Sequence, residues 1–165
     1  MVFLSIRTDF SAFIMASQAQ TPFNAGLETG TGPKDPTFRS YNASQAAKYA
    51  KARPGYADEL YQYVINHHKA TGGQLGTLVD VGCGPGTATR DLAKYFDHAF
   101  GCDPSDAMIA EASSANYKTR SSENVSFQVC LAEEINKLQG LEPGSVDMII
   151  CAMSVSTFRT LTLCF

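Results

Sequence analysis

Apolar residues recur at helical spacing before residue 76. Between residues 57 and 70 they fall three and four positions apart, which places them on one face of an amphipathic helix. A shorter helix is expected over residues 43–52, because Asn42 and Gln45 have the spacing of a capping box and a Pro-Gly pair follows. We therefore predict that residues 41–76 form a helical arm and a first helix.

After residue 76 the pattern changes to short β-prone runs that alternate with helical stretches. Strands are expected at residues 77–81, 99–102, 125–131 and within 145–155. Helices are expected between them at residues 87–95, 105–112 and 133–138. This order predicts an α/β fold with a parallel, Rossmann-like sheet between two helical layers, a three-layer αβα architecture. Ligands bind such sheets at the carboxyl ends of the strands.

Residues 1–40 give a weaker pattern and are predicted to be a flexible N-terminal extension. Residues 1–14 begin with a short apolar run that Arg7 interrupts, and residues 16–37 are rich in Ser, Gln, Thr, Gly and Pro. The apolar run is too short for the core of a secretory signal, and no run approaches a membrane span. We therefore set residues 1–14 outside the predicted fold and expect no membrane partner.

The charge and the cysteine content of the chain limit which binding partners and which cellular location are expected. The formal net charge is -3 and charged residues make up 18% of the chain, with no cluster of Lys and Arg. A nucleic-acid surface needs many phosphate contacts, so this balance argues against nucleic acid and favours a small-molecule partner. The five cysteines are odd in number and none has CxxC spacing, which indicates reduced thiols and a cytoplasmic location.

A glycine-rich loop follows the first strand of the predicted sheet. Gly82, Gly84 and Gly86 form the pattern GxGxG, in which the backbone can approach a ligand closely. The helix that follows offers backbone N–H donors. A dinucleotide loop of the form GxGxxG would require glycine at position 87 or 89, where this chain has Thr87 and Thr89. The loop also lacks the lysine of a Walker motif, so it favours an adenosyl ligand without a pyrophosphate.

An acidic residue supports this interpretation. Asp103 ends the second predicted strand, roughly 20 residues after the loop, where a carboxylate can accept hydrogen bonds from ribose hydroxyls. A loop, a helix, a strand and an acid in this order are more specific than the loop alone. A nucleotide-dependent oxidoreductase on a similar fold is the alternative, and the two threonines argue against it.

With these motifs, residues 41–155 resemble class I S-adenosylmethionine-dependent methyltransferases of the small-molecule type. The most similar group is the trans-aconitate methyltransferase-like branch, indicated by a Tyr-x-x-x-Arg-Pro-x-Tyr segment. The segments that carry the resemblance are residues 49–56, 78–87, 101–105, 108–109, 132–134 and 146–150. The resemblance implies S-adenosyl-L-methionine as the cofactor.

The resemblance also implies roles for residues of the glycine loop. Gly82, Gly84 and Gly86, with Cys83 between them, would cradle the methionine part of the cofactor. Asp80 would help to order the loop and meet the amino group. These roles would make the loop the centre of the cofactor site.

Residues after the later strands are implied in binding the adenosine part. Asp103, followed by Pro104, would bind the ribose hydroxyls, and Met108 would pack against adenine. Ala132 and Glu133 stand where the family contacts the edge of the adenine ring. The sequence therefore predicts a site built from three strand ends.

Two residues of the arm complete the implied site. Tyr49 and Arg53 would close over the cofactor, and Arg53 would pair with its carboxylate. The expected reaction is an in-line displacement in which an acceptor atom, oxygen before nitrogen or carbon, attacks the methyl group. A carboxylic acid is a candidate acceptor that would need no general base, so no catalytic residue and no metal are predicted.

The resemblance also has departures. Leu131 stands where the family often has Asp, and the His-Trp-Phe segment expected after the fourth strand does not appear in residues 156–165. We expect residues 77–155 to form the cofactor-binding core, residues 156–165 to form a divergent tail, and the chain to be truncated after the fourth strand. That strand would then be an exposed edge. An impaired isoform that binds the cofactor weakly, or a non-catalytic remnant, is the corresponding alternative to an active enzyme.

Overall fold

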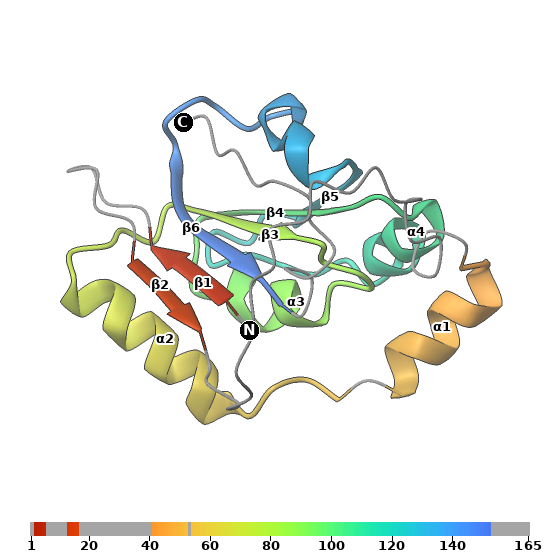
Figure 1. The fold of residues 1–165 in the computed structure, drawn as a ribbon, viewed down its shortest axis with the longest axis horizontal. Coiled ribbons are helices and arrows are strands. Elements are labelled where there is room, and N and C mark those ends of the chain that lie inside the picture. The colour runs from red at the N-terminus through yellow and green to blue at the C-terminus, as the bar shows by residue number, and fades with distance from the viewer. Residues whose placement is uncertain (1, 6–12, 17–40, 53, 153–165) are drawn as a thin grey trace, which may run out of the picture.

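A six-stranded sheet forms the centre of the molecule, as seen in a computed structural model that describes residues 2–5, 13–16, 41–52 and 54–152 (Figure 1). The strand order is β2-β1-β6-β3-β4-β5. The strands are β1 (Val2–Ser5), β2 (Phe13–Ala16), β3 (Thr77–Val81), β4 (His98–Asp103), β5 (Ser126–Val129) and β6 (Val146–Cys151). The four strands β6, β3, β4 and β5 run parallel, which confirms the predicted Rossmann-like sheet.

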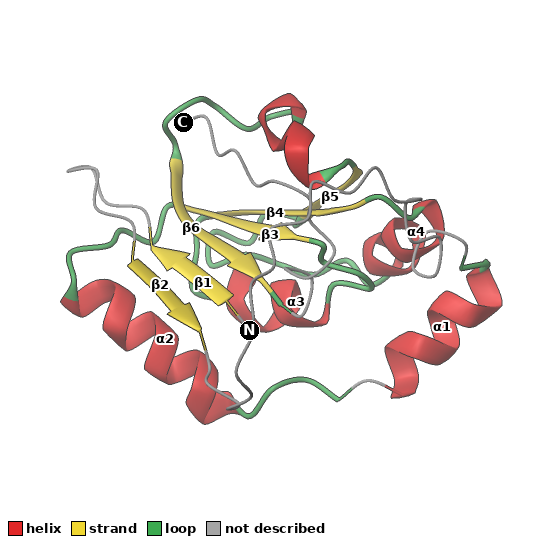
Figure 2. Cartoon of the chain, viewed as in Figure 1, coloured by secondary structure: helices red, strands yellow, loops and turns green. Residues whose placement is uncertain are grey.

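Helices connect and flank the strands (Figure 2). They are α1 (Ala43–Ala52), α2 (Asp58–Ala70), α3 (Thr87–Ala93), α4 (Asp106–Ser114) and the 3-10 helix η1 (Ala132–Lys137). The predicted capping box of α1 is confirmed, since Asn42 and Gln45 each donate a backbone N–H to the other's side-chain oxygen at 2.9 Å. Ser105 caps α4 by accepting the Met108 N–H at 3.4 Å.

Some predicted boundaries differ from the observed ones. The helix predicted to reach residue 95 ends at Ala93, because the N–H groups of Tyr95 and Phe96 bond three residues back and tighten the chain. The strand predicted over residues 125–131 covers only Ser126–Val129. These differences fall at element ends, where local patterns are least decisive.

The N-terminal residues depart most from prediction. Val2–Ser5 and Phe13–Ala16 pair as an antiparallel hairpin, and β1 also pairs antiparallel with β6, with Val2 opposite Cys151. The prediction that residues 1–14 lie outside the fold is therefore wrong for the parts that form these strands. The expectation that the fourth parallel strand is an edge is wrong for the same reason. The backbone N–H and C=O groups on the outer side of β6 can hydrogen-bond to another strand, and β1 is that strand.

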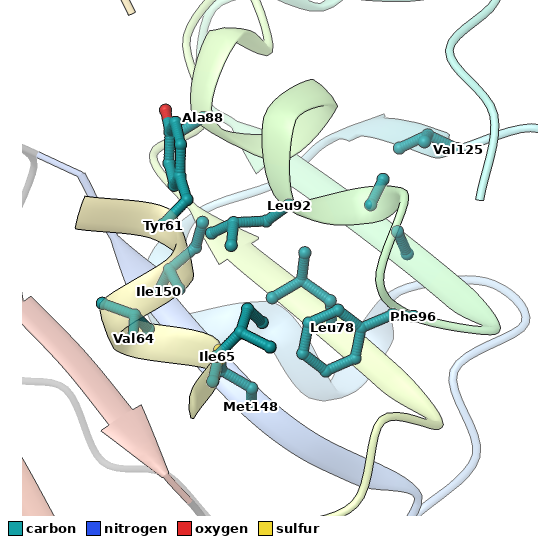
Figure 3. Close-up of a cluster of buried hydrophobic side chains, with 12 residues drawn as sticks. Tyr61, Val64, Ile65, Leu78, Ala88, Leu92, Phe96, Val125, Met148 and Ile150 are labelled. Carbon is teal, nitrogen blue, oxygen red and sulfur yellow. The ribbon is translucent and has the colours of Figure 1, made fainter. Parts of the chain in front are cut away.

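One face of the sheet is covered by α2 and α3. Alternate residues of the strands, such as Leu78 of β3 and Met148 of β6, meet apolar side chains from these helices (Figure 3). Ten residues of this layer are labelled in Figure 3: Tyr61, Val64, Ile65, Leu78, Ala88, Leu92, Phe96, Val125, Met148 and Ile150. Packing on this face fixes α3, and with it the loop that precedes α3.

The opposite face is covered by η1, which lies on the other side of the sheet in Figure 1. Val79 of β3 and Ile149 of β6 pack there against Ala132 and Ile135. All five residues of β3 are buried, so this strand is central between two apolar layers. The three layers confirm the predicted architecture and leave the strand ends as the positions for polar side chains.

Candidate functional site

The glycine loop between β3 and α3 has a backbone that requires glycine. Gly82, Gly84 and Gly86 have φ angles of 71°, 53° and 81°, in the left-handed region that other residues rarely adopt. The N–H groups of Gly82 and Cys83 both donate to the carbonyl oxygen of Cys102, at 2.8 and 3.0 Å. These bonds fasten the start of the loop to the carboxyl end of β4.

Asp103 joins the loop from the end of β4. Its Oδ2 accepts the Gly84 N–H at 3.1 Å, and its Oδ1 accepts the Ser105 N–H at 2.9 Å. Apart from its two chain neighbours, no heavy atom of the described residues lies within 4 Å of the position a Cβ would take at Gly84, so open space adjoins the middle of the loop. The glycine loop and Asp103, which a helix separates in the sequence, are therefore in direct contact. The open space at Gly84 leaves room for a ligand beside them.

Asp80 lies beneath the loop and is fully buried. Its Oδ2 accepts the Thr89 hydroxyl at 2.6 Å, whereas its Oδ1 has no hydrogen-bond partner among the described residues. Burial raises the pKa of Asp80 from 3.8 to about 7, and the Thr89 hydrogen bond only partly opposes this effect. A buried carboxyl with an unsatisfied oxygen is a position where a cationic or hydrogen-bonding ligand would stabilise the charged form.

The thiols of the cysteines around the loop are buried in the core. Cys83, Cys102 and Cys151 are buried, and burial raises the pKa of each thiol, that of Cys151 to about 12. Such thiols stay protonated and are poor nucleophiles. Among residues 41–52 and 54–152 and the two hairpin strands, no group of His, Cys, Asp and Glu could hold a metal ion.

Residues 78–162, just over half of the chain, match the family profile of a methyltransferase domain. The chain belongs to the methyltransferase domain family. S-adenosyl-L-methionine is the cofactor of this class of methyltransferases, and the fold is the Rossmann-like class I methyltransferase fold.

Curated relatives support membership of this methyltransferase family. One is "Probable S-adenosylmethionine-dependent methyltransferase CRG1" of Saccharomyces cerevisiae, 33% identical over 111 residues, which are 67% of this chain and 36% of that protein. Another is methyltransferase pgmE of Aspergillus terreus, 33% identical over 91 residues, which are 53% of this chain and 27% of that protein. The chain thus spans about a third of the length of these relatives.

A solved methyltransferase shares the fold. Magnesium protoporphyrin IX methyltransferase (ChlM) from Synechocystis PCC 6803 aligns with a TM-score of 0.52 and 20% sequence identity. The alignment covers 79% of this chain and 67% of that one. At this identity the likeness concerns the arrangement of strands and helices.

Within this methyltransferase domain, the other predicted residues follow the ends of β4 and β5. Pro104 is half-buried beside Asp103, Ala132 is 8% exposed, and Glu133 is exposed at the start of η1. Met108 is only 3% exposed, so its predicted contact with adenine stays a prediction and its burial favours a role in the core. Among these residues Asp103 contacts the glycine loop directly, and Pro104 follows it in the sequence.

The helical arm lies beside α4. Helix α1 packs against α4, and on it Tyr49 is half-buried with its ring 5.8 Å from that of Tyr41. Arg53 lies outside the described residues. Closure of the arm over the cofactor therefore stays a prediction.

Sequence reasoning missed two residues that shape the site. It used Thr89 only to exclude a dinucleotide loop, whereas the Thr89 hydroxyl bonds Asp80. It assigned no role to Phe127, whose ring lies against Gly86 and Gly101. The glycine inside β4 was an available signal, since a glycine in a strand often marks a close approach of another group.

Proposed function

We propose that the carboxyl ends of β3 and β4 form the S-adenosyl-L-methionine site of a methyltransferase that acts on a small molecule. The observation that carries the proposal is the hydrogen bond from the Gly84 N–H to Asp103 Oδ2. This bond joins the glycine loop, whose backbone can approach a ligand closely, to Asp103, whose carboxylate can accept hydrogen bonds from ribose hydroxyls. Methyl transfer by the whole protein is part of the proposal, because the chain spans about a third of its curated relatives.

The residues present fit this cofactor. Gly82, Gly84 and Gly86 would hold its methionine part beside the open space at Gly84, and Asp103 would hold its ribose. One buried oxygen of Asp80 has no hydrogen-bond partner in the part of the chain that the structure describes, and a positively charged ligand nearby would favour the ionised form of Asp80. Cys83, Pro104, Ala132, Glu133, Met108, Tyr49 and Arg53 complete the proposed cofactor-binding set.

The cofactor supplies an electrophilic methyl group, and the protein supplies its placement. The loop is fixed to β4 through the Cys102 carbonyl, so its backbone is ordered before a ligand arrives. The buried floor of Asp80 and Thr89 keeps water from the underside of the loop. No side chain is proposed as an acid or base, and a carboxylic acid is the candidate acceptor.

Four features bear on the finer parts of the proposal. The net charge of -3 supports a small-molecule acceptor over nucleic acid. The free thiols of Cys83, Cys102, Cys130 and Cys151 support a reducing, cytoplasmic location. No described helix is long and apolar enough to cross a membrane. The trans-aconitate-like branch rests on the segment of residues 49–56, of which Arg53 is not described.

Calorimetric titration with S-adenosylhomocysteine and with NAD tests the cofactor. We expect S-adenosylhomocysteine to bind and NAD not to bind. The substitution Asp103→Asn should weaken S-adenosylhomocysteine affinity by about tenfold or more, because a charged acceptor for two hydroxyls is lost. The matched control is Asp106→Asn, an exposed acid in the next helix, which should leave the affinity unchanged.

Two results would overturn the proposal. Tighter binding of NAD would favour the oxidoreductase alternative. An equal effect of Asp103→Asn and Asp106→Asn would remove Asp103 from the site. Methyl turnover by the purified chain, measured in parallel, tests the proposed activity separately from cofactor binding.

A further inference from the structure

Phe127 occupies a space that two glycines leave open. It lies on β5 directly opposite Gly101 of β4. A Cβ at Gly101 would stand 2.6 Å from Phe127 Cδ1, and a Cβ at Gly86 would stand 2.9 Å from Phe127 Cζ. Both separations are shorter than real Cβ contacts, so the ring and any larger residue at either position exclude each other.

The two glycines belong to the two parts that build the proposed site. Gly86 is the last glycine of the loop, and Gly101 directly precedes Cys102, whose carbonyl receives the loop N–H groups. Asp103 follows at once and accepts the Gly84 N–H. The Phe127 ring therefore touches the loop and the strand at the place where they are joined.

The ring is itself held in place. The Tyr117 ring packs edge-on against Phe127, with centroids 6.2 Å apart and an interplanar angle of 72°. The guanidinium of Arg90 on α3 lies 5.9 Å from the centre of the Tyr117 ring. The positions of Phe127 and α3, which begins directly after the loop, are thus coupled through Tyr117.

A loop with three left-handed glycines has much conformational freedom to lose when it is ordered. Hydrogen bonds to Cys102 hold its first two residues, and single hydrogen bonds join Gly84 to Asp103 Oδ2 and Gly86 to the Cys83 carbonyl. A rigid aromatic ring against Gly86 restricts the other end of the loop. A smaller side chain at position 127 would leave a cavity below the loop and permit other loop conformations.

We propose that Phe127 is a positioning residue that holds the glycine loop in its cofactor-binding shape, through its contacts with Gly86 and Gly101. The inference rests on the proposed cofactor site. Phe127 would not touch the reacting atoms. Its effect on binding would be to make the loop backbone ready for the ligand, which reduces the ordering cost of binding.

The first test compares Phe127→Leu with Phe96→Leu in the full chain. Phe96 is a fully buried aromatic residue of the same core layer, so its substitution removes similar apolar volume. We expect Phe127→Leu to weaken S-adenosylhomocysteine affinity by about tenfold at a temperature where both variants are folded, and Phe96→Leu to leave it within about twofold. Equal losses of affinity in both variants would overturn the inference.

The second test uses the steric exclusion itself. Gly101→Ala alone should weaken binding, because its Cβ collides with the ring. Adding Phe127→Leu should recover part of that loss, because the smaller side chain makes room. Two losses that simply add would contradict the proposed contact.

A readout that needs no ligand separates this inference from the proposed function. Hydrogen exchange at the amides of Gly84 and Gly86, which donate to Asp103 Oδ2 and to the Cys83 carbonyl, should be faster in Phe127→Leu and unchanged in Phe96→Leu. If the unaltered chain binds no S-adenosylhomocysteine, the proposed function fails, while this exchange difference still supports the positioning role. Unchanged exchange in Phe127→Leu would overturn the role.

Discussion

The two ends of the parallel strands carry acidic side chains in opposite electrostatic surroundings. At the amino end, the Asp97 carboxylate accepts hydrogen bonds from Arg120 Nη2 at 2.6 Å, Arg120 Nε at 3.0 Å and the Ser121 hydroxyl at 2.9 Å. The hydrogen bonds from Arg120 hold the pKa of Asp97 below its usual value. Asp147 at the same end accepts the Thr77 N–H at 2.8 Å. Both of these acids receive hydrogen bonds from the chain itself.

At the carboxyl end, Asp80 is buried, and its Oδ1 receives no hydrogen bond from any residue that the structure describes. The pKa of Asp80 is raised to about 7, in the opposite direction to that of Asp97. A cleft at the amino end is lined by residues that include Lys69, Asp97 and Arg120, but the acid and the guanidinium there already bind each other. The difference supports the proposal that the carboxyl end binds the ligand, whereas the acids of the amino end contribute to stability.

The largest expected effect is on the pH dependence of stability at Asp80. The folded chain holds a proton on Asp80 up to about pH 7, whereas the unfolded chain releases it above about pH 4. The stabilisation from the neutral acid is therefore full below pH 3.8 and lost as the pH rises to about 7. In Asp80→Asn the free energy of unfolding, relative to the unaltered chain, should rise by about 4 kcal/mol between about pH 4 and 8.

Urea unfolding of both chains across this range is the measurement. Asp97→Asn is the control from the amino end and should behave with the opposite sign. Because the pKa of Asp97 is lowered, its contribution is present above its unfolded pKa and is lost as the pH falls through its folded value. If the free energy of unfolding, relative to the unaltered chain, changed with pH in the same direction in both variants, the proposed difference between the two strand ends would be wrong.

A smaller effect is expected for the partner of Asp80. Thr89→Val keeps the shape of the side chain but removes the hydroxyl that donates to Asp80 Oδ2 at 2.6 Å. Leaving this buried oxygen without the donor should lower the free energy of unfolding by about 2 kcal/mol. Thr87→Val, at a half-buried position in the same helix, should change stability less when measured by the same urea titration. A neutral Thr89→Val would show that the Asp80 hydrogen bond contributes little.

Local sequence signals were sufficient where an element is fixed by its own residues. The bounds of β3 and α1 were predicted exactly, because β3 is an unbroken buried run before glycines and α1 begins with a capping box. The acid at the end of β4 and the glycine loop were also found from spacing. Their contact follows from the parallel topology, which brings the carboxyl ends of neighbouring strands together.

Long-range pairings account for what the sequence could not predict. Val2–Ser5 is a strand because β6, far along the chain, offers a free edge, and no local pattern contains that information. The contact of Phe127 with Gly86 and Gly101 likewise depends on three separate elements. In each case tertiary packing decides the role of the residue.

The most direct test of the account is the affinity for S-adenosylmethionine in Asp80→Asn and Asp97→Asn, measured by calorimetry at about pH 8, where Asp80 is ionised. The account predicts about tenfold weaker binding in Asp80→Asn, because the charge that faces the cationic cofactor is lost. It predicts unchanged binding in Asp97→Asn, whose carboxylate is paired with Arg120 at the other end of the strands. Unchanged binding in Asp80→Asn, or an equal loss in both variants, would contradict it.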